Sequence, residues 1–370
     1  MSHQLHVATR KGLFTIEGGG GTWGVKRGDF IGDNISMVLN DPRDGRTYAA
    51  LDHGHFGVKL HCTTGTDGTW EECGVPAYPP HPDGTHDTDA MGRQIPWTTV
   101  KLWGLETGGS DRTGLLWCGT LPGGLFRSRD SGSTWELIRP LWDKPERKEW
   151  FGGGYDVPGI HAICVDPRDS DVVRAAVSCG GIWTTRDGGE TWTCDYDGMG
   201  AAYMPPDQKY APHVQDPHYL AQGREDPDVL WVQHHNGIYV ATDGGKHWVE
   251  IEKAGPSTFG FAAAVHPKDS KTAWFVPAVK DELRYPVDGK FVVTRTRDGG
   301  KSFDVLSRGL PQQHAYDLVY RHGLDITETG DVLAMGSTTG SLWVSEDQGD
   351  SWITVSHNLP PIYCVRFATG

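Results

Sequence analysis

The sequence lacks any run of about 18 consecutive apolar residues, the length that a membrane-spanning helix requires. Residues 1–7 also lack the basic stretch and apolar core of an export signal, so we expect a cytoplasmic protein. Basic side chains are scarce: 34 Lys and Arg stand against 48 Asp and Glu, a formal net charge of −14. This balance argues against a nucleic acid or a membrane as partner, but it permits a local basic site for a small acidic molecule.

Helical periodicity is hard to find in the chain, and cysteine is limited to 7 residues. The odd cysteine count and the missing export signal favour reduced thiols. Turn-forming residues are abundant by contrast, with 50 Gly and 23 Pro, and Trp is frequent at 15. Because the glycines follow no G-X-Y period, they indicate turns between strands. Length and composition therefore predict one large all-β domain that spans residues 1–370.

A short motif, S/T-x-D-x-G-x-T/S-W/F, recurs along the chain. Clear copies cover 128–135, 185–192, 241–248, 296–303 and 345–352, with a shortened copy at 66–70 and a degenerate one at 20–23. Its Asp can accept backbone N–H groups across a tight turn, its Gly supplies a positive φ, and its aromatic residue buries a large apolar surface. The motif therefore predicts a hairpin, and we expect its acidic residues to hold turns and to take no part in catalysis: Asp130, Asp187, Asp243, Asp298 and Asp347.

Seven such units follow one another at intervals of 47 to 65 residues, about the length of a four-stranded propeller blade. A second turn, rich in Pro, precedes several of them, at 41–45, 166–169 and 266–269. The N-terminus supplies only three strands and the C-terminus ends on a lone one, 362–367. We therefore predict a seven-bladed β-propeller closed by pairing of that last strand with the N-terminal blade, which residues 1–30 and 360–370 share.

The repeats resemble the Asp-box, or BNR, repeat of sialidases, xyloglucanase-type glycosidases, sortilin-type receptors and a photosystem assembly factor. The resemblance covers nearly the whole chain and is closest to bacterial BNR-repeat proteins labelled sialidase-like or glycosyl hydrolase-like, whose activity is unproven. It implies a propeller and leaves the function open. Sialidases carry an early Arg-Ile-Pro motif, whereas the nearest string here, 93–96, contains an extra Gln. We therefore do not transfer the sialidase site, and we do not expect sialidase activity.

The two ends of the predicted propeller differ in their loops. Asp boxes and Pro turns lie at one end, and the loops that join the second to the third strand, or one blade to the next, lie at the other. Three long insertions, 74–97, 139–157 and 197–217, fall in the loops between blades. Because ligand sites favour concave regions with unrepeated residues, we predict the functional site at this second end, around the channel mouth.

Histidine is unevenly distributed toward this mouth. Of 17 histidines, seven map to its loops, at positions 53, 55, 161, 218, 234, 235 and 314. Converging neutral imidazoles are common ligands of Zn, Cu, Fe and Mn, so a divalent transition metal is one predicted cofactor. The proposed ligands are His53, His55, His161 and His218, with His234 and His235 close by.

Acid–base catalysis without a metal is the alternative chemistry. A His and a Tyr could act as base and acid, as in the propeller-fold polysaccharide lyases that this pattern resembles, or an acidic residue could protonate a glycosidic oxygen. The catalytic candidates are His234, His235, Asp281, Glu282, Tyr316 and Asp317, and the substrate-binding candidates are Arg10, Lys11, Tyr155, Lys280 and His314. We thus predict an enzyme that hydrolyses, or eliminates from, a carbohydrate or another small anionic molecule. A non-catalytic ligand-binding or assembly propeller is the rival interpretation.

Overall fold

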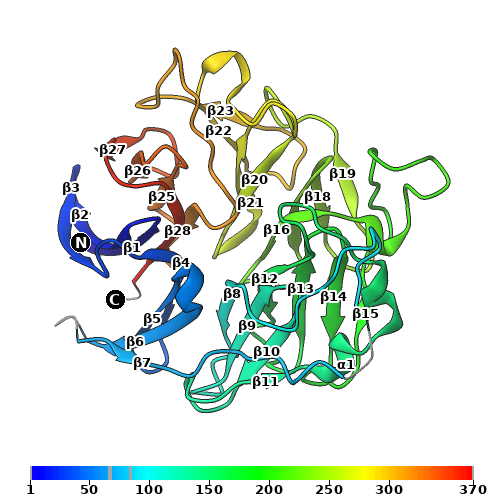
Figure 1. Ribbon diagram of the computed structural model, residues 1–370. Helices are drawn as coiled ribbons and strands as arrows, with labels where there is room; N and C mark the ends of the chain where they lie inside the picture. The colour runs from blue at the N-terminus through cyan, green and yellow to red at the C-terminus, as the bar shows by residue number, and fades with distance from the viewer. Residues whose placement is uncertain (1, 66–68, 83–85, 369–370) are drawn as a thin grey trace.

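The computed structural model describes residues 2–65, 69–82 and 86–368. Their strands form seven four-stranded antiparallel sheets arranged around a central axis (Figure 1). The innermost strands contact one another in cyclic order, β4, β8, β12, β16, β20, β24, β28 and back to β4. The predicted all-β, seven-bladed propeller is confirmed. None of the helices in the described part of the chain is long and apolar enough to cross a membrane.

Each blade runs from its innermost to its outermost strand. The first four blades are β4 (Asn34–Asp41), β5 (Arg46–Asp52), β6 (Val58–Thr64), β7 (Glu71–Glu72); β8 (Lys101–Thr107), β9 (Leu116–Leu121), β10 (Leu125–Ser128), β11 (Glu136–Leu137); β12 (Ile160–Val165), β13 (Val173–Val177), β14 (Gly181–Thr185), β15 (Thr193–Cys194); and β16 (Pro217–Gln222), β17 (Leu230–His234), β18 (Gly237–Ala241), β19 (Val249–Ile251). The last three are β20 (Gly260–His266), β21 (Asp269–Pro277), β22 (Val293–Thr296), β23 (Asp304–Leu306); β24 (Leu324–Ile326), β25 (Leu333–Gly336), β26 (Leu342–Ser345), β27 (Ile353–Ser356); and β28 (Ile362–Phe367), β1 (His3–Thr9), β2 (Gly12–Gly19), β3 (Thr22–Asp29).

Helical structure is confined to loops. One short α-helix, α1 (Arg139–Trp142), and the 3₁₀ turns Pro145–Glu149 and Pro212–Val214 lie in two of the insertions between blades. The turns Gly54–Phe56 and Val287–Gly289 lie in loops between second and third strands.

The two ends of the chain close the ring. Strand β28 pairs antiparallel with β1, in a register that sets Val7 opposite Val365 and Leu5 opposite Phe367. Those four side chains are buried together in one apolar cluster. The prediction that the C-terminal strand completes the N-terminal blade is therefore confirmed, with β28 as the innermost strand of a complete four-stranded blade.

The Asp-box turns are built as their chemistry predicts. In the copy at 185–192, Asp187 Oδ1 accepts the backbone N–H groups of Glu190 and Thr191 at 3.1 and 2.9 Å, and Oδ2 accepts the Thr191 hydroxyl at 2.6 Å. Gly188 and Gly189 adopt φ of 69° and 104°, which favour glycine. Trp192 is 3% exposed and packs in the core beside Trp117 and Trp183. The shortened copy at 66–70 has its first three residues outside the described part of the chain.

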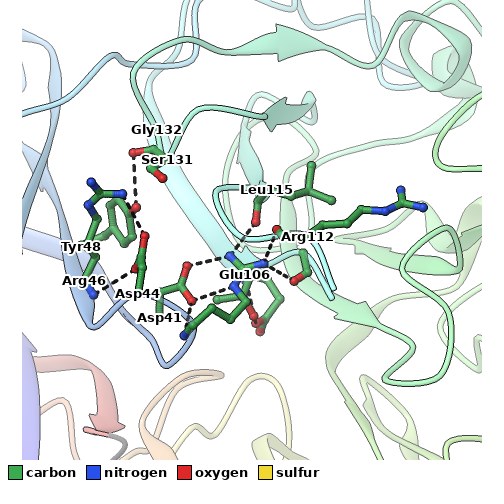
Figure 2. Close-up of polar contacts among 12 residues, drawn as sticks. Asp41, Asp44, Arg46, Tyr48, Glu106, Arg112, Leu115, Ser131 and Gly132 are labelled. Carbon is green, nitrogen blue, oxygen red and sulfur yellow. Dashed lines mark hydrogen bonds and ion pairs between the residues drawn. The ribbon is translucent and has the colours of Figure 1, made fainter. Parts of the chain in front are cut away.

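The Pro turns join neighbouring blades at the same end of the molecule. The Arg43 guanidinium donates to both oxygens of Asp41, at 2.7 and 2.6 Å, and to the carbonyls of Arg112 and Leu115 in the next blade, at 2.9 and 2.8 Å. Figure 2 shows Asp41, Arg112 and Leu115 around this contact. In the same view the Tyr48 hydroxyl donates to the carbonyl of Ser131, at 3.2 Å. We call this end, with its Asp boxes and Pro turns, the Asp-box face.

Candidate functional site at the channel mouth

The opposite end, which we call the mouth, consists of the first residues of the innermost strands and the loops around them. All seven innermost strands run in the same direction, so their first residues meet at one end of the channel. Aromatic rings and histidines gather there, with these residues at or near the strand starts: Trp103 of β8, His161 of β12, His218 of β16, Phe261 of β20 and Tyr363 of β28.

Three side chains at the mouth converge on one point. Asp216 directly precedes β16, His218 lies in β16, and His235 follows β17. Asp216 Oδ2 lies 3.4 Å from His218 Nε2 and 3.4 Å from His235 Nδ1. The ligand atoms of the three residues all lie within 4.8 Å of one another. Among the described residues, this is the group whose His and carboxylate atoms could hold a metal ion.

His218 is held in a fixed orientation. Its Nδ1 lies 2.7 Å from the carbonyl oxygen of Gly260, and its ring stacks on Phe261 with centroids 4.3 Å apart and planes 11° apart. Since a carbonyl only accepts, Nδ1 carries a proton, and in the neutral ring Nε2 then presents a lone pair to Asp216. Burial lowers the pKa of His218, which favours that neutral ring. His218 Nε2 and Asp216 Oδ2 are therefore two acceptor atoms that face each other, an arrangement that is stable only with a shared proton or a cation between them.

Asp216 is fixed from several sides and is 1% exposed. Its Oδ1 accepts the backbone N–H of Cys179 at 3.3 Å, and its carbonyl accepts the N–H of His235 at 2.9 Å. A Cβ at Gly153 would lie 2.6 Å from Cys179 Sγ and 3.2 Å from Asp216 Oδ2, so only glycine fits there. Burial alone would raise the pKa of Asp216, but a proton shared with His218 and His235, together with the charge of Arg321, outweighs burial and holds this pKa well below its usual value. The carboxylate is thus charged and rigidly aimed at the two histidines.

The three long insertions between blades contribute residues around the cluster of Asp216, His218 and His235. Gly153 belongs to 139–157, and Tyr203, from 197–217, packs edge-on against the His235 ring at 4.8 Å. Arg93, in 74–97, donates to the carbonyl of Asp156 at 2.6 Å. Arg93, which begins the string that most resembles the sialidase Arg-Ile-Pro motif, therefore uses its guanidinium to bind a loop backbone.

A second group of side chains lies next to the cluster. The guanidinium of Arg321 lies 4.9 Å from the ring of Trp103 and 5.5 Å from that of Phe261. Trp103 also contacts Tyr155, whose hydroxyl accepts from Lys101 Nζ at 2.9 Å, and the buried His161. Burial holds the pKa of His161 well below its usual value. The mouth thus combines a carboxylate–histidine cluster with cations set among aromatic rings.

The predicted histidines divide between the cluster and other positions. His218 and His235 join Asp216. His234 is fully buried, with its Nε2 3.0 Å from the N–H of Asp216, and burial lowers its pKa to about 3. Its contacts support a role in positioning Asp216. The metal candidates His53, His55 and His161 supply no atom to the cluster: His53 lies 3.6 Å from Asp33, and His55 lies in an exposed turn.

The remaining predicted residues lie in the loops around the mouth. Asp281 pairs with Arg284, and Glu282 with Lys280 at 3.2 Å. Asp317 accepts the Ser337 hydroxyl at 2.8 Å. A separate cavity of about 440 Å³ is lined by residues that include His314, Tyr316 and Tyr285. Tyr155 is 42% exposed beside Trp103, whereas Arg10 and Lys11 are exposed in the turn between β1 and β2.

Sequence reasoning did not select Asp216, Trp103 or Arg321. Asp216 could have been found from the string Asp216-Pro217-His218 in a loop between blades. An Asp and a His two residues apart on an extended strand point to the same side and can bind one ligand. Trp103 and Arg321 carry no such signal, because their importance comes from burial and from contacts between different blades.

Comparison with known proteins agrees with the fold. No protein-family model and no curated protein sequence matches the chain. An ancestral GH74 enzyme is similar, with a TM-score of 0.58 and 15% identity over 90% of this chain and 38% of that one, so the chain spans 38% of the enzyme's length. YCF48 bound to D1 peptide is similar with a TM-score of 0.53 and 15% identity, over 87% of this chain and 80% of that one.

A second YCF48 structure, from Cyanidioschyzon merolae, gives a TM-score of 0.53 and 14% identity, over 88% of this chain and 87% of that one. At such identities the likeness establishes the propeller fold alone. The resemblance to glycosidase and assembly-factor propellers is confirmed at that level, and membership of the BNR-repeat proteins stays a prediction.

Proposed function

We propose that this protein is an enzyme that acts on a carbohydrate or another small anionic molecule at the mouth, with a divalent transition metal bound by Asp216, His218 and His235. The observation that carries the proposal is the convergence of one carboxylate and two imidazoles on a single point. One carboxylate with two histidines is a ligand set found in catalytic metal sites that keep positions open for water and substrate.

The two separations between Asp216 and the histidines support this assignment. Tetrahedral ligands with bonds of about 2.0–2.1 Å lie about 3.4 Å from one another. The distances from Asp216 Oδ2 to the two histidine nitrogens are both 3.4 Å, too long for a strong hydrogen bond. The carbonyl of Gly260, on Nδ1 of His218, is the kind of partner that orients metal-binding histidines.

Each side chain then has a role. A bound metal would supply a Lewis acid and a water of lowered pKa. His234 and the N–H of Cys179 fix Asp216, while Phe261 fixes the plane of His218. His235 is the most accessible of the three ligands, with 20% of its side chain exposed, so it faces the side from which a substrate would arrive. Tyr155, which is 42% exposed, offers a flat apolar face on which a sugar ring can stack.

Metal content tests the proposal first. Protein purified without an affinity tag should carry about one equivalent of a transition metal, measured by elemental analysis, and Asp216→Asn should lose it. His247→Ala is a matched control, because His247 also lies against a carboxylate, Asp197 at 2.8 Å, but on the exposed surface. A content below about a tenth of an equivalent, after incubation with Zn²⁺, Mn²⁺ and Fe²⁺, would remove the metal from the proposal.

Activity is tested with aryl glycosides and uronate polymers, in metal-loaded wild type and in His235→Ala. We expect turnover by the wild type that falls at least about a hundredfold in the variant, since the variant lacks a ligand of the metal. Equal turnover by the two proteins would contradict the assigned site.

A non-catalytic binding propeller is the second candidate. The likeness in fold to YCF48, which extends over 80% of that chain, favours it. A wild type that holds its metal and binds a ligand at the mouth, yet turns over none of the substrates, would support this candidate over the enzyme.

A further inference from the structure

Arg321 is exceptional among the buried arginines. The other arginines below 9% exposure each have a carboxylate within 4.0 Å: Arg127 with Glu136, Arg147 with Asp87, Arg174 with Asp166, and Arg295 with Asp304. Arg321 is 7% exposed and lacks such a carboxylate among the described residues. Its Nε is buried without a hydrogen-bond partner, as are the Nε atoms of Arg127, Arg174 and Arg295, so the missing carboxylate is what sets Arg321 apart. Within the described ranges, no hydrogen bond or ion pair reaches its guanidinium.

The negative charge of Asp216, which attracts Arg321, is already committed elsewhere. No ion pair within 4.0 Å joins them in the part of the chain that the structure describes, because Asp216 is directed at His218, His235 and Cys179. A buried charge without a partner is costly, so a protein keeps one where a ligand supplies the partner.

The surroundings of Arg321 select a particular shape of anion. Trp103 and Phe261 lie against the guanidinium, at 4.9 and 5.5 Å from ring to charge centre, while Gly154 lies beside its Nη2. A guanidinium packed against rings keeps its edge for hydrogen bonding, and that edge matches the two oxygens of a planar carboxylate. A tetrahedral phosphate would call for further donors around it.

We infer that Arg321 is the anion-recognition residue of the mouth and that the ligand carries a carboxylate, as a uronic acid does. The inference rests on the proposed function only in placing the ligand at the same mouth. The carboxylate would pair with Arg321 between Trp103 and Phe261, and the rest of the ligand would extend toward His235. Tyr155 and Lys101, beside Trp103, would then line its path.

Calorimetric titration with glucuronate tests the inference, with methyl glucuronate ester and inorganic phosphate as the other two probes. We expect the wild type to bind glucuronate at least about tenfold more tightly than either probe. The titrations are run on metal-loaded and on chelator-treated protein. Selective binding in both states would uphold the carboxylate site even if the metal or the enzymatic activity were disproved.

Variants then assign the binding to Arg321. Arg321→Gln and Arg321→Lys should each weaken glucuronate binding at least about tenfold, since a lysine is a point charge without the planar fork. Arg284→Gln is the matched control: Arg284 also lies against Phe261, at 5.3 Å, but is exposed and already paired with Asp281, so affinity should stay within about twofold. Circular dichroism and thermal unfolding confirm that each variant is folded.

A third variant places a carboxylate of the protein itself beside Arg321, where the ligand's carboxylate would bind. A Cβ at Gly154 would lie 3.5 Å from Arg321 Nη2, so Gly154→Asp brings a carboxylate to the guanidinium. This variant should unfold at a higher temperature and bind glucuronate at least about tenfold more weakly. The inference is overturned if the wild type does not bind glucuronate at about 10 mM, if the methyl ester binds equally well, or if the Arg321 variants bind like the wild type.

Discussion

Arg43 and Arg321 both have little exposed surface at opposite ends of the propeller, and they differ in their partners. The Arg43 side chain, 7% exposed, donates to both oxygens of Asp41 and to carbonyls of the next blade. Arg321, buried as a whole residue, has neither a hydrogen bond nor an ion pair among the described residues. Low exposure alone therefore does not separate the two arginines, whereas their hydrogen bonds and ion pairs do.

The same contrast holds for the acidic residues. Asp187 on the Asp-box face uses its two oxygens to accept four hydrogen bonds from its own turn. Asp216 at the mouth directs one oxygen toward two histidine nitrogens at 3.4 Å, which are not close enough to satisfy it. Repeated residues with complete local bonding hold the fold, and unrepeated residues with incomplete bonding indicate where a ligand binds.

Removing a core aromatic beneath the Asp-box face should have the largest effect on stability. Trp192→Ala should lower the free energy of unfolding by about 4 kcal/mol, because the ring is 3% exposed and packs between blades. Urea denaturation measures the change, and Val305→Ala, at a site that is 51% exposed, serves as the control with little effect. A loss below about 1 kcal/mol would show that the ring does not hold the blades together.

Exchanging each arginine for methionine tests the opening comparison directly. Arg43→Met leaves Asp41 buried without its cation and should cost about 3 kcal/mol of unfolding free energy. Arg321→Met removes a charge that has no partner and keeps the contact with Trp103, so stability should stay the same or rise. Both changes are read from urea denaturation. Equal losses in the two variants would mean that Arg321 has a structural partner after all.

The fold was predictable because its information is local and repeated. Each Asp box fixes its own hairpin through residues within eight positions of one another, so the pattern is visible without knowledge of contacts between blades. Closure was predictable as well, because an N-terminal blade of three strands leaves a place for the lone strand at 362–367.

Only part of the candidate site was visible in the sequence. The count of histidines indicated the mouth, and two of those residues, His218 and His235, lie together there. Asp216, beside them, and Arg321 come from different loops, and their surroundings depend on burial and on distances across blades. His234 differs from its neighbour: adjacent in sequence to His235, it lies against the backbone N–H of Asp216 and is fully buried. A one-residue step along the chain reverses the direction of a side chain, and only the structure shows which histidine faces the cluster.

The smallest predicted effect concerns the Asp-box turns themselves. Asp187 accepts the hydroxyl and N–H of Thr191 and the hydroxyl of Thr185, and these bonds lower its pKa from 3.8 to about 2. A carboxylate whose folded-state pKa is lowered stabilises the folded protein above its unfolded pKa, and this contribution disappears as the pH falls from about 4 to about 2. Asp187→Asn should therefore lower the midpoint of thermal unfolding by a few degrees at pH 7 and by less near pH 2. Asp207→Asn, at an exposed position, is the control substitution.

Metal content and glucuronate binding should stay at wild-type values in Asp187→Asn, because the Asp-box turn lies at the other end of the blade. If this variant lost ligand binding while it kept its unfolding temperature, the two ends of the propeller would have the reverse of the roles assigned to them.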